Sequence, residues 1–163
     1  MNVIPTDRPS MPDWYPAFLE AVATHVAADN NTVLTNWSIG QEILRWQPSS
    51  DWSSRAIDHL STDLTARFPT RKGLSARNLR YMITFAESWP LEAYARGPLA
   101  RLPWYHHLTL IQKLTNRTHR LWYARESIDN KWTHATLKAH IANNFYRTQH
   151  LRTPPKSKKK KTT

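Results

Sequence analysis

Basic and hydrogen-bonding side chains are concentrated between Asp63 and Glu87, a stretch in which no acidic residue occurs. Arginine and lysine bind phosphate oxygens, and arginine and asparagine also form paired hydrogen bonds with the edges of bases. The cluster therefore predicts contact with a nucleic acid. The residues expected to make this contact are Arg67, Arg71, Lys72, Ser75, Arg77, Asn78, Arg80, Tyr81 and Thr84.

Two predicted helices meet at a corner that carries these side chains. Pro69 ends the first helix, and Ser75 is expected to cap the second by accepting a backbone hydrogen bond. Leu74, just before this cap, is expected to pack on Leu79 as a hydrophobic staple. Helical periodicity places apolar residues on one face of the second helix and polar residues on the opposite face. The apolar face holds Leu79, Met82, Ile83 and Ala86, and the polar face holds Arg77, Arg80, Tyr81 and Thr84.

The corner resembles a helix-turn-helix, in which residues near the start of the second helix contact bases. Its turn of about six residues is longer than the standard three or four, which is typical of a looser or winged-type corner. The alternative interpretation is an ordinary solvated helix face, whose charged side chains only contact water. The charge distribution of the whole chain makes the two interpretations about equally favoured.

Charge is strongly polarised along the chain, whose formal net charge is +11. Residues 1–63 hold three basic and eight acidic residues, a net of −5, whereas residues 64–163 hold twenty and four, a net of +16. This polarity predicts a positively charged surface that suits a polyanion and an acidic surface that suits a different binding partner. A membrane is the competing polyanion, but the sequence has no basic amphipathic helix and no lipidation motif. Nucleic acid, as double-stranded DNA, is the favoured partner.

The C-terminal end is a run of lysines without apolar residues, so residues 152–163 are expected to form a disordered tail. Its lysines would strengthen binding to any phosphate backbone without reading sequence. These tail residues are Lys158, Lys159, Lys160 and Lys161. A second corner, over residues 117–145 with Thr133 as a cap, carries further basic residues, but packing helices with solvated edges are the favoured interpretation there.

The sequence lacks the residues or the spacing that metal binding, nuclease cleavage or serine hydrolase chemistry requires. The chain has no cysteine, and its eight histidines include no pair four residues apart as in a zinc-binding helix. Asp129, Asn130 and Lys131 formally match the D-x-K of a nuclease, but they lie at a predicted helix end without a partner acid. No serine lies in a G-x-S-x-G context. We therefore expect no catalytic residue, no metal ligand and no cofactor.

The apolar residues recur at helical spacing almost throughout, and only three glycines occur, which predicts an all-α fold. We expect a flexible segment over residues 1–13, one helical domain over residues 14–151, and the tail. No signal peptide or membrane-spanning run is found, so a cytoplasmic location is expected. The expected helices cover residues 14–28, 32–46, 52–68, 76–89, 104–114, 117–130 and 134–148.

Several segments resemble, in order, those of the N-terminal domain of the YhcG-like PD-(D/E)XK nuclease family. Residues 34–43 read LTNWSIGQEI and are similar to its L-x-x-W-x-I-G-x-x-I segment. Residues 60–64 (LSTDL), 68–69 (FP) and 73–82 (GLSARNLRYM) are similar to its L-S-x-D-L, F-P and G-F-S-x-R-N-L-x-x-M segments. Residues 102–107 (LPWYHH), 122–124 (WYA) and 130–133 (NKWT) resemble its L-P-W-S-H and W-Y…W-S segments.

This resemblance implies a helical, helix-turn-helix-like domain that serves DNA binding or processing and that precedes a nuclease domain in the family. Here the lysine tail stands where that domain would begin, so catalysis is not implied. A stand-alone module, acting in regulation or defence or with a separate nuclease, is favoured over a fragment. The rival function is a protein-interaction or assembly module that uses the acidic half and exposed tryptophans. Self-association stays open.

Overall fold

The structure, a computed structural model, describes residues 11–28, 32–89 and 97–152. Over these residues the regular structure is helical, and no strand occurs among them. The predicted all-α fold class is therefore confirmed. The chain divides into two compact units, Met1–Glu87 and Ser88–Thr163, which are called unit 1 and unit 2 below. None of the helices in the described residues is long and apolar enough to cross a bilayer.

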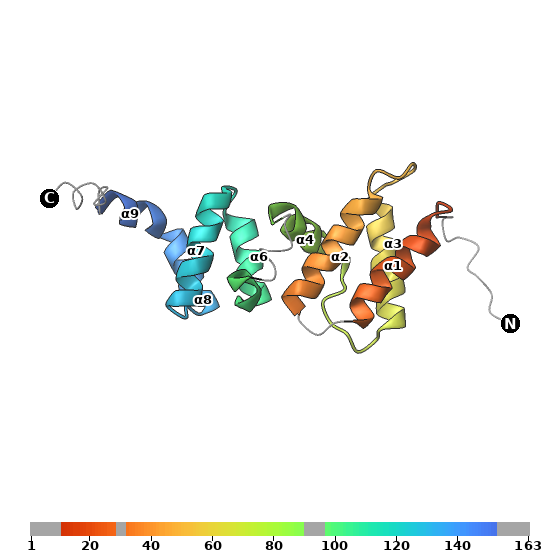
Figure 1. Cartoon of the computed structure of the whole chain (residues 1–163), viewed down its shortest axis with the longest axis horizontal. Helices are drawn as coiled ribbons and strands as arrows, with labels where there is room; N and C mark the ends of the chain where they lie inside the picture. The colour runs from red at the N-terminus through yellow and green to blue at the C-terminus, as the bar shows by residue number, and fades with distance from the viewer. Residues whose placement is uncertain (1–10, 29–31, 90–96, 153–163) are drawn as a thin grey trace. The chain divides into compact units, whose positions relative to one another are not determined.

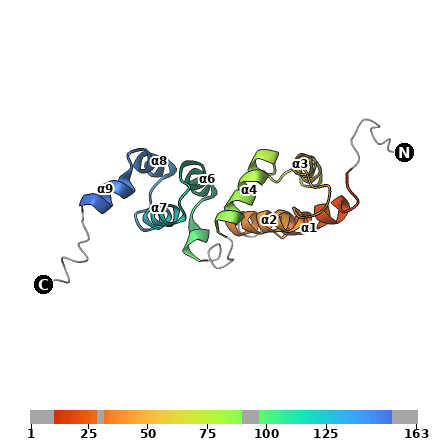
Figure 2. The same cartoon turned by 90° about the horizontal axis from the view of Figure 1, so that it is seen from above.

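Unit 1 is built from four helices in the described residues. They are α1 (Tyr15–Ala27), α2 (Thr32–Trp46), α3 (Arg55–Arg67) and α4 (Ala76–Ser88). Figure 1 shows α1 and α2 side by side, and Figure 2 shows α3 and α4 lying on one side of that pair. Each helix turns its apolar stripe inward, as the 3.6-residue period requires. The fully buried side chains include Phe18, Val22, Ile39, Ile43, Leu60, Leu64, Leu79 and Met82.

Helices α2 and α4 approach each other closely at Gly40. A Cβ atom at this position would collide with the backbone oxygen of Met82 and would lie 2.9 Å from the Cβ of Ala86. The Gln41 side-chain amide also donates a hydrogen bond to the backbone oxygen of Ala86, at 3.3 Å. Glycine is therefore the residue that allows this helix contact. The contact holds α4 against the core and leaves its other face outward.

Unit 2 continues the chain with a 3₁₀ turn, η1 (Pro98–Arg101), and four further helices. These are α6 (Trp104–Lys113), α7 (Arg117–Asp129), α8 (His134–Ala142) and α9 (Phe145–Arg152). Helix α6 packs against both α7 and α8, and α9 packs against α7 and α8. The core of the unit includes Leu110, Tyr123, Ala124 and Leu137, each no more than 2% exposed.

The one long helix expected over residues 134–148 is wrong, because the chain there forms α8 and α9. Asn144, between them, adopts a left-handed backbone with φ of 53°, which breaks the helical ladder. Asparagine tolerates this conformation better than most residues. The hydroxyl of Tyr123 then accepts a hydrogen bond from the backbone N–H of Tyr146, at 2.9 Å, near the start of α9. A tertiary contact thus satisfies a donor that the break leaves unpaired within the helix.

Candidate nucleic-acid interface

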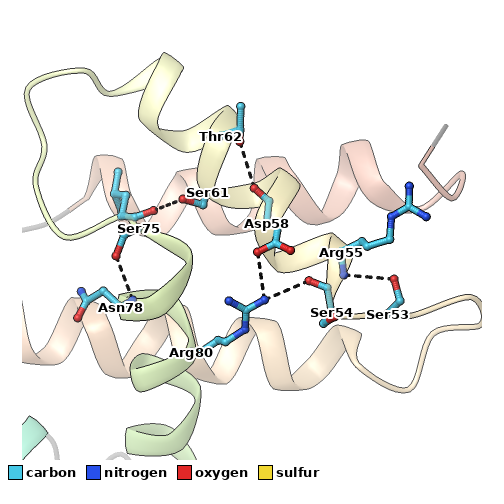
Figure 3. Close-up of polar contacts among 10 residues, drawn as sticks. Ser53, Ser54, Arg55, Asp58, Ser61, Thr62, Ser75, Asn78 and Arg80 are labelled. Atoms are coloured by element: carbon cyan, nitrogen blue, oxygen red, sulfur yellow. Dashed lines mark hydrogen bonds and ion pairs between the residues drawn. The ribbon is translucent and has the colours of Figure 1, made fainter. Parts of the chain in front are cut away.

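The corner between α3 and α4 is fixed at its second helix by the predicted cap. The Oγ atom of Ser75 accepts a hydrogen bond of 3.1 Å from the backbone N–H of Asn78, so α4 begins at Ala76 as expected. Leu74 and Leu79 are both buried, as the predicted staple requires. The hydroxyl of Ser61 on α3 donates to the backbone oxygen of Leu74, at 2.7 Å (Figure 3). The linker is therefore tied to both helices.

The linker itself, residues 68–75, is longer than the predicted six-residue turn. Gly73 adopts φ of 84°, a left-handed conformation that favours glycine. The side-chain amide of Asn78 donates to the backbone oxygen of Gly73, at 2.7 Å, and Nη1 of Arg71 donates to the backbone oxygen of Lys72. Both side chains therefore shape the linker, whereas Lys72 is exposed.

Arg67, predicted to contact nucleic acid, forms an ion pair with Glu20 of α1. Its Nη2 lies 2.6 Å from Oε2 of Glu20, and its Nη1 lies 3.1 Å from Oε1, a two-point contact. The hydrogen bond from Arg67 lowers the pKa of Glu20 below its ordinary value. Both side chains are largely exposed, so the pair contributes little to stability, but it neutralises the guanidinium.

Arg80 is paired in the same way across the corner. Its Nη2 lies 3.1 Å from Oδ1 of Asp58 and 3.4 Å from the backbone oxygen of Ser54, both near the start of α3. Figure 3 shows Arg80 crossing from α4 to these two groups. The contact links the two helices and directs this guanidinium toward the protein.

Arg77, which is exposed, and Tyr81, which is half-buried, form a pair one turn apart on α4. Nε and Nη2 of Arg77 donate to the hydroxyl of Tyr81 at 3.3 and 3.2 Å, and the guanidinium carbon lies 5.6 Å from the ring centroid. Thr84, the next residue on this face, is half-buried and donates to the backbone oxygen of Arg80 at 3.2 Å. The predicted polar face therefore exists, but its members differ in what they offer a ligand.

The corner is less positive than its own sequence window indicates. Of the predicted residues, Lys72 and Arg77 keep exposed cationic groups without a carboxylate partner in the described residues, whereas Arg67 and Arg80 are paired. The neutralising acids, Glu20 and Asp58, lie 47 and 22 residues away in the chain. No local pattern pointed to them. The four tail lysines, residues 158–161, lie outside the described residues.

Unit 2 carries a denser set of exposed cations. Residues 97–152 contain nine basic and two acidic residues, a net of +7. Within the described residues, seven exposed cations of this unit have no carboxylate partner: Arg101, Lys113, Arg117, Arg125, Lys131, Lys138 and Arg147. Arg117 also lies over the ring of Trp89, with 5.9 Å between the guanidinium carbon and the ring centroid.

Arg120 is the exception among the basic residues of the second corner. Its guanidinium donates to Oγ of Ser88 at 2.8 Å and to the backbone oxygens of Leu114 and Ile111 at 2.9 and 3.4 Å. Burial lowers the pKa of this group. Arg120 is therefore a structural residue that closes the turn between α6 and α7. The predicted cap at Thr133 is confirmed, because its Oγ1 accepts from the backbone N–H of Thr136 at 3.1 Å.

The histidines are dispersed among local contacts. His107 is 1% exposed, and its Nε2 lies 2.9 Å from the backbone oxygen of Leu99. Burial lowers the pKa of His107 to about 4, so this ring is neutral at pH 7. In the part of the chain that the structure describes, no three histidine, aspartate or glutamate side chains gather as metal ligands would.

Comparison with known proteins identifies the family. No curated protein and no solved structure matches the chain. The DUF1016 N-terminal domain family matches residues 20–148, which is most of the chain and includes both units in large part. The match is to an N-terminal domain and not to a nuclease domain. The chain therefore belongs to the DUF1016 N-terminal domain family, the N-terminal domain of YhcG-like proteins.

Proposed function

We propose that this chain is a nucleic-acid-binding module that takes duplex DNA as its ligand and has no catalytic site of its own. The proposal is carried by the exposed cations that have no carboxylate partner in the described residues. Most of these cations lie in unit 2, and Arg77 of α4 adds one more. Each contact between such a group and a phosphate releases condensed counterions, which favours binding.

Unit 2 supplies the part of the affinity that is independent of sequence. Its lysines and arginines lie at exposed positions of η1, of the four helices and of the turn that follows α7. Phosphate contacts of this kind hold a protein on a duplex but read no bases. The lysines of the tail add to the same electrostatic attraction.

Helix α4 supplies the discrimination between sequences. Arg77 is exposed near the start of the helix, where a recognition helix contacts bases, and Tyr81 restricts its guanidinium. A restrained arginine loses less conformational freedom when it binds the two acceptors of a guanine. Lys72, exposed in the linker, would bind a neighbouring phosphate.

The test compares four versions of this chain by fluorescence anisotropy on labelled duplexes across a salt series. The proteins are the unchanged chain, Arg77→Ala, Lys113→Ala, and a variant with Lys158, Lys159, Lys160 and Lys161 replaced by glutamine. We expect Arg77→Ala to reduce the preference among sequences, while the tail variant weakens all duplexes alike. Lys113→Ala is the matched control that removes one exposed cation away from α4. The proposal is wrong if the tail variant alone abolishes binding.

A second function, the holding of a partner protein, is favoured by the aromatic side chains of unit 2. Trp122, Phe145 and Tyr146 are half-buried. The ring centroid of Trp122 lies 5.8 Å from that of Phe145 and 5.1 Å from that of Tyr146. Tryptophan and tyrosine are frequent in interface hot spots. A separate nuclease is one such partner. This function gains support if DNA binding depends on the tail alone.

A further inference from the structure

Three aromatic rings of unit 2 form a column between α7 and α9. The ring centroid of Tyr146 lies 4.1 Å from that of His119 on α7 and 3.9 Å from that of His150, one turn further along α9. Two rings at these distances cannot share one face of a tyrosine without touching each other, and His119 and His150 make no such contact. The two histidines therefore lie on opposite faces of Tyr146.

His150 is the exposed end of this column. Its Nδ1 lies 2.7 Å from the backbone oxygen of Tyr146, which can only accept, so Nδ1 carries a proton and the bond orients the ring. Trp122 meets both rings at steep angles, at 5.1 Å from Tyr146 and 5.8 Å from His150. Because Trp122 is nearer to Tyr146, it lies beside the column and not over its end. The exposed surface of His150 therefore includes the outer face of its ring.

The column is held in place by buried contacts of α9. The hydroxyl of Tyr123, which is 2% exposed, accepts from the backbone N–H of Tyr146 at 2.9 Å. Phe145, the first residue of α9, packs on Trp122 and Trp132, each at 5.8 Å between ring centroids. Figure 1 and Figure 2 both show α9 at an edge of unit 2. The helix thus presents an oriented ring at the edge of the unit.

Positive charge lies beside the exposed ring. Arg147 precedes His150 by three residues and shares its side of α9, because residues three apart are neighbours on a helix surface. Arg147 is exposed and has no carboxylate partner in the described residues. Helix α9 contains no acidic residue, and the acids of α7, Glu126 and Asp129, lie in its last turn, whereas His119 lies in its first.

An exposed ring at the end of a stack, next to an arginine, suits a flat group that carries negative charge. A nucleotide has both parts, since its base stacks on aromatic side chains and its phosphate binds arginine. A base inside a duplex already has both faces covered by its neighbours. Only an unpaired base can therefore extend the column.

We infer that this end of α9 binds an unpaired nucleotide of a single strand. The base stacks on the outer face of His150, and the guanidinium of Arg147 contacts an adjacent phosphate. The inference rests on the proposed function in that the ligand is a nucleic acid, but it uses no residue of α4 and requires no duplex. It also assigns to nucleic acid the aromatic surface on which the partner-protein function depends.

The test measures fluorescence anisotropy of three labelled ligands with the unchanged chain. They are a blunt duplex, a single-stranded oligothymidine, and a strand of the same length whose nucleotides are abasic. The two strands carry the same phosphates, so their difference isolates the bases. We expect oligothymidine to bind at least about fivefold more tightly than the abasic strand.

The three ligands distinguish this inference from the proposed function. Equal affinity for oligothymidine and the abasic strand overturns the inference, whatever the affinity for the duplex. Absence of binding to the blunt duplex overturns the proposed function and leaves the inference standing if oligothymidine is still preferred.

Variants at His150 locate the base. His150→Leu keeps an apolar side chain but removes the ring, and it should reduce the affinity for oligothymidine to that for the abasic strand. His150→Phe keeps a ring and should retain the preference. Tyr105→Leu removes a ring that is 68% exposed and lies outside the column, and it should leave the affinity nearly unchanged. Circular dichroism of thermal unfolding checks that the three variants fold alike.

Arg147→Gln tests the phosphate contact separately. It should make the slope of log affinity against log salt for oligothymidine shallower by about 0.7, the value for one phosphate of a single strand. The preference for oligothymidine over the abasic strand should remain, because the ring is unchanged. Equal affinity of His150→Leu and His150→Phe for oligothymidine would overturn the inference and return this surface to the partner-protein function.

Discussion

Arg67 at the end of α3 is neutralised by Glu20 of α1, with 2.6 Å between Nη2 and Oε2. This pair joins two helices of unit 1 and withdraws a cation from the surface that the sequence predicts for nucleic acid. Arg80 is held by Asp58 in the same way, at 3.1 Å. The net positive charge that the corner exposes is therefore set by acids from outside the basic window.

Release of Arg67 should strengthen DNA binding. In Glu20→Gln the carboxylate is lost, so the guanidinium becomes available to a phosphate, and the slope of log affinity against log salt should steepen by roughly one. Glu87→Gln removes an exposed acid at the end of α4 that forms no ion pair in the described residues, and it serves as the control. An equal gain in both variants would show a general effect of charge and not a release of Arg67.

The Tyr81 hydroxyl should matter for DNA binding through Arg77. Tyr81→Phe keeps the ring but removes the oxygen that accepts from Nε and Nη2 of Arg77. We expect a loss of affinity of a few-fold on the preferred duplex, of the size of one hydrogen bond, and little loss on others. Tyr105→Phe is the matched change, because Tyr105 is 68% exposed and lies in unit 2. Unchanged sequence preference in Tyr81→Phe would count against recognition by α4.

Gly40→Ala should destabilise unit 1. The added Cβ meets the backbone oxygen of Met82, which cannot rotate away, so α2 and α4 must separate. Overpacking of this kind costs about 1 to 3 kcal/mol, which lowers the thermal midpoint by several degrees. Circular dichroism of thermal unfolding measures the change. Ser38→Ala, at a half-buried position of the same helix, should change stability by less than about 1 kcal/mol.

The stability of unit 2 should fall on acidification because of His107. Its pKa in the folded chain is lowered by burial to about 4, from an ordinary value of 6.5. The folded state therefore binds fewer protons than the unfolded state between these values. The stabilisation is complete above pH 6.5 and is lost as pH falls toward 4, by roughly 3 kcal/mol at most.

His107→Gln tests this pH dependence. Glutamine keeps an N–H donor for the backbone oxygen of Leu99 but does not titrate. Chemical denaturation between pH 7 and pH 4 should therefore show a shallower loss of stability than in the unchanged chain. His59→Gln, a half-buried histidine of unit 1, is the control. The same loss in all three proteins would exclude His107 as the cause.

Local sequence was sufficient for the helices of this protein and for their caps. Apolar residues at helical spacing predicted the all-α fold, and Ser75 and Thr133 cap helices where expected. These features depend on residues within a few positions of one another, which is the range over which helix geometry operates. The family followed from ordered motifs along the chain.

Tertiary structure decided which of the charged side chains already have a partner. Arg67 and Arg80 each pair with a carboxylate far away in the chain, and Arg120 donates to Ser88, which lies 32 residues away. Tyr123 likewise accepts a hydrogen bond from the backbone N–H of Tyr146, which lies 23 residues away and follows the break at Asn144. A sequence lists charges and donors, but only the packing of helices determines which of them already have partners, because ion pairs and hydrogen bonds act over a few ångströms in space.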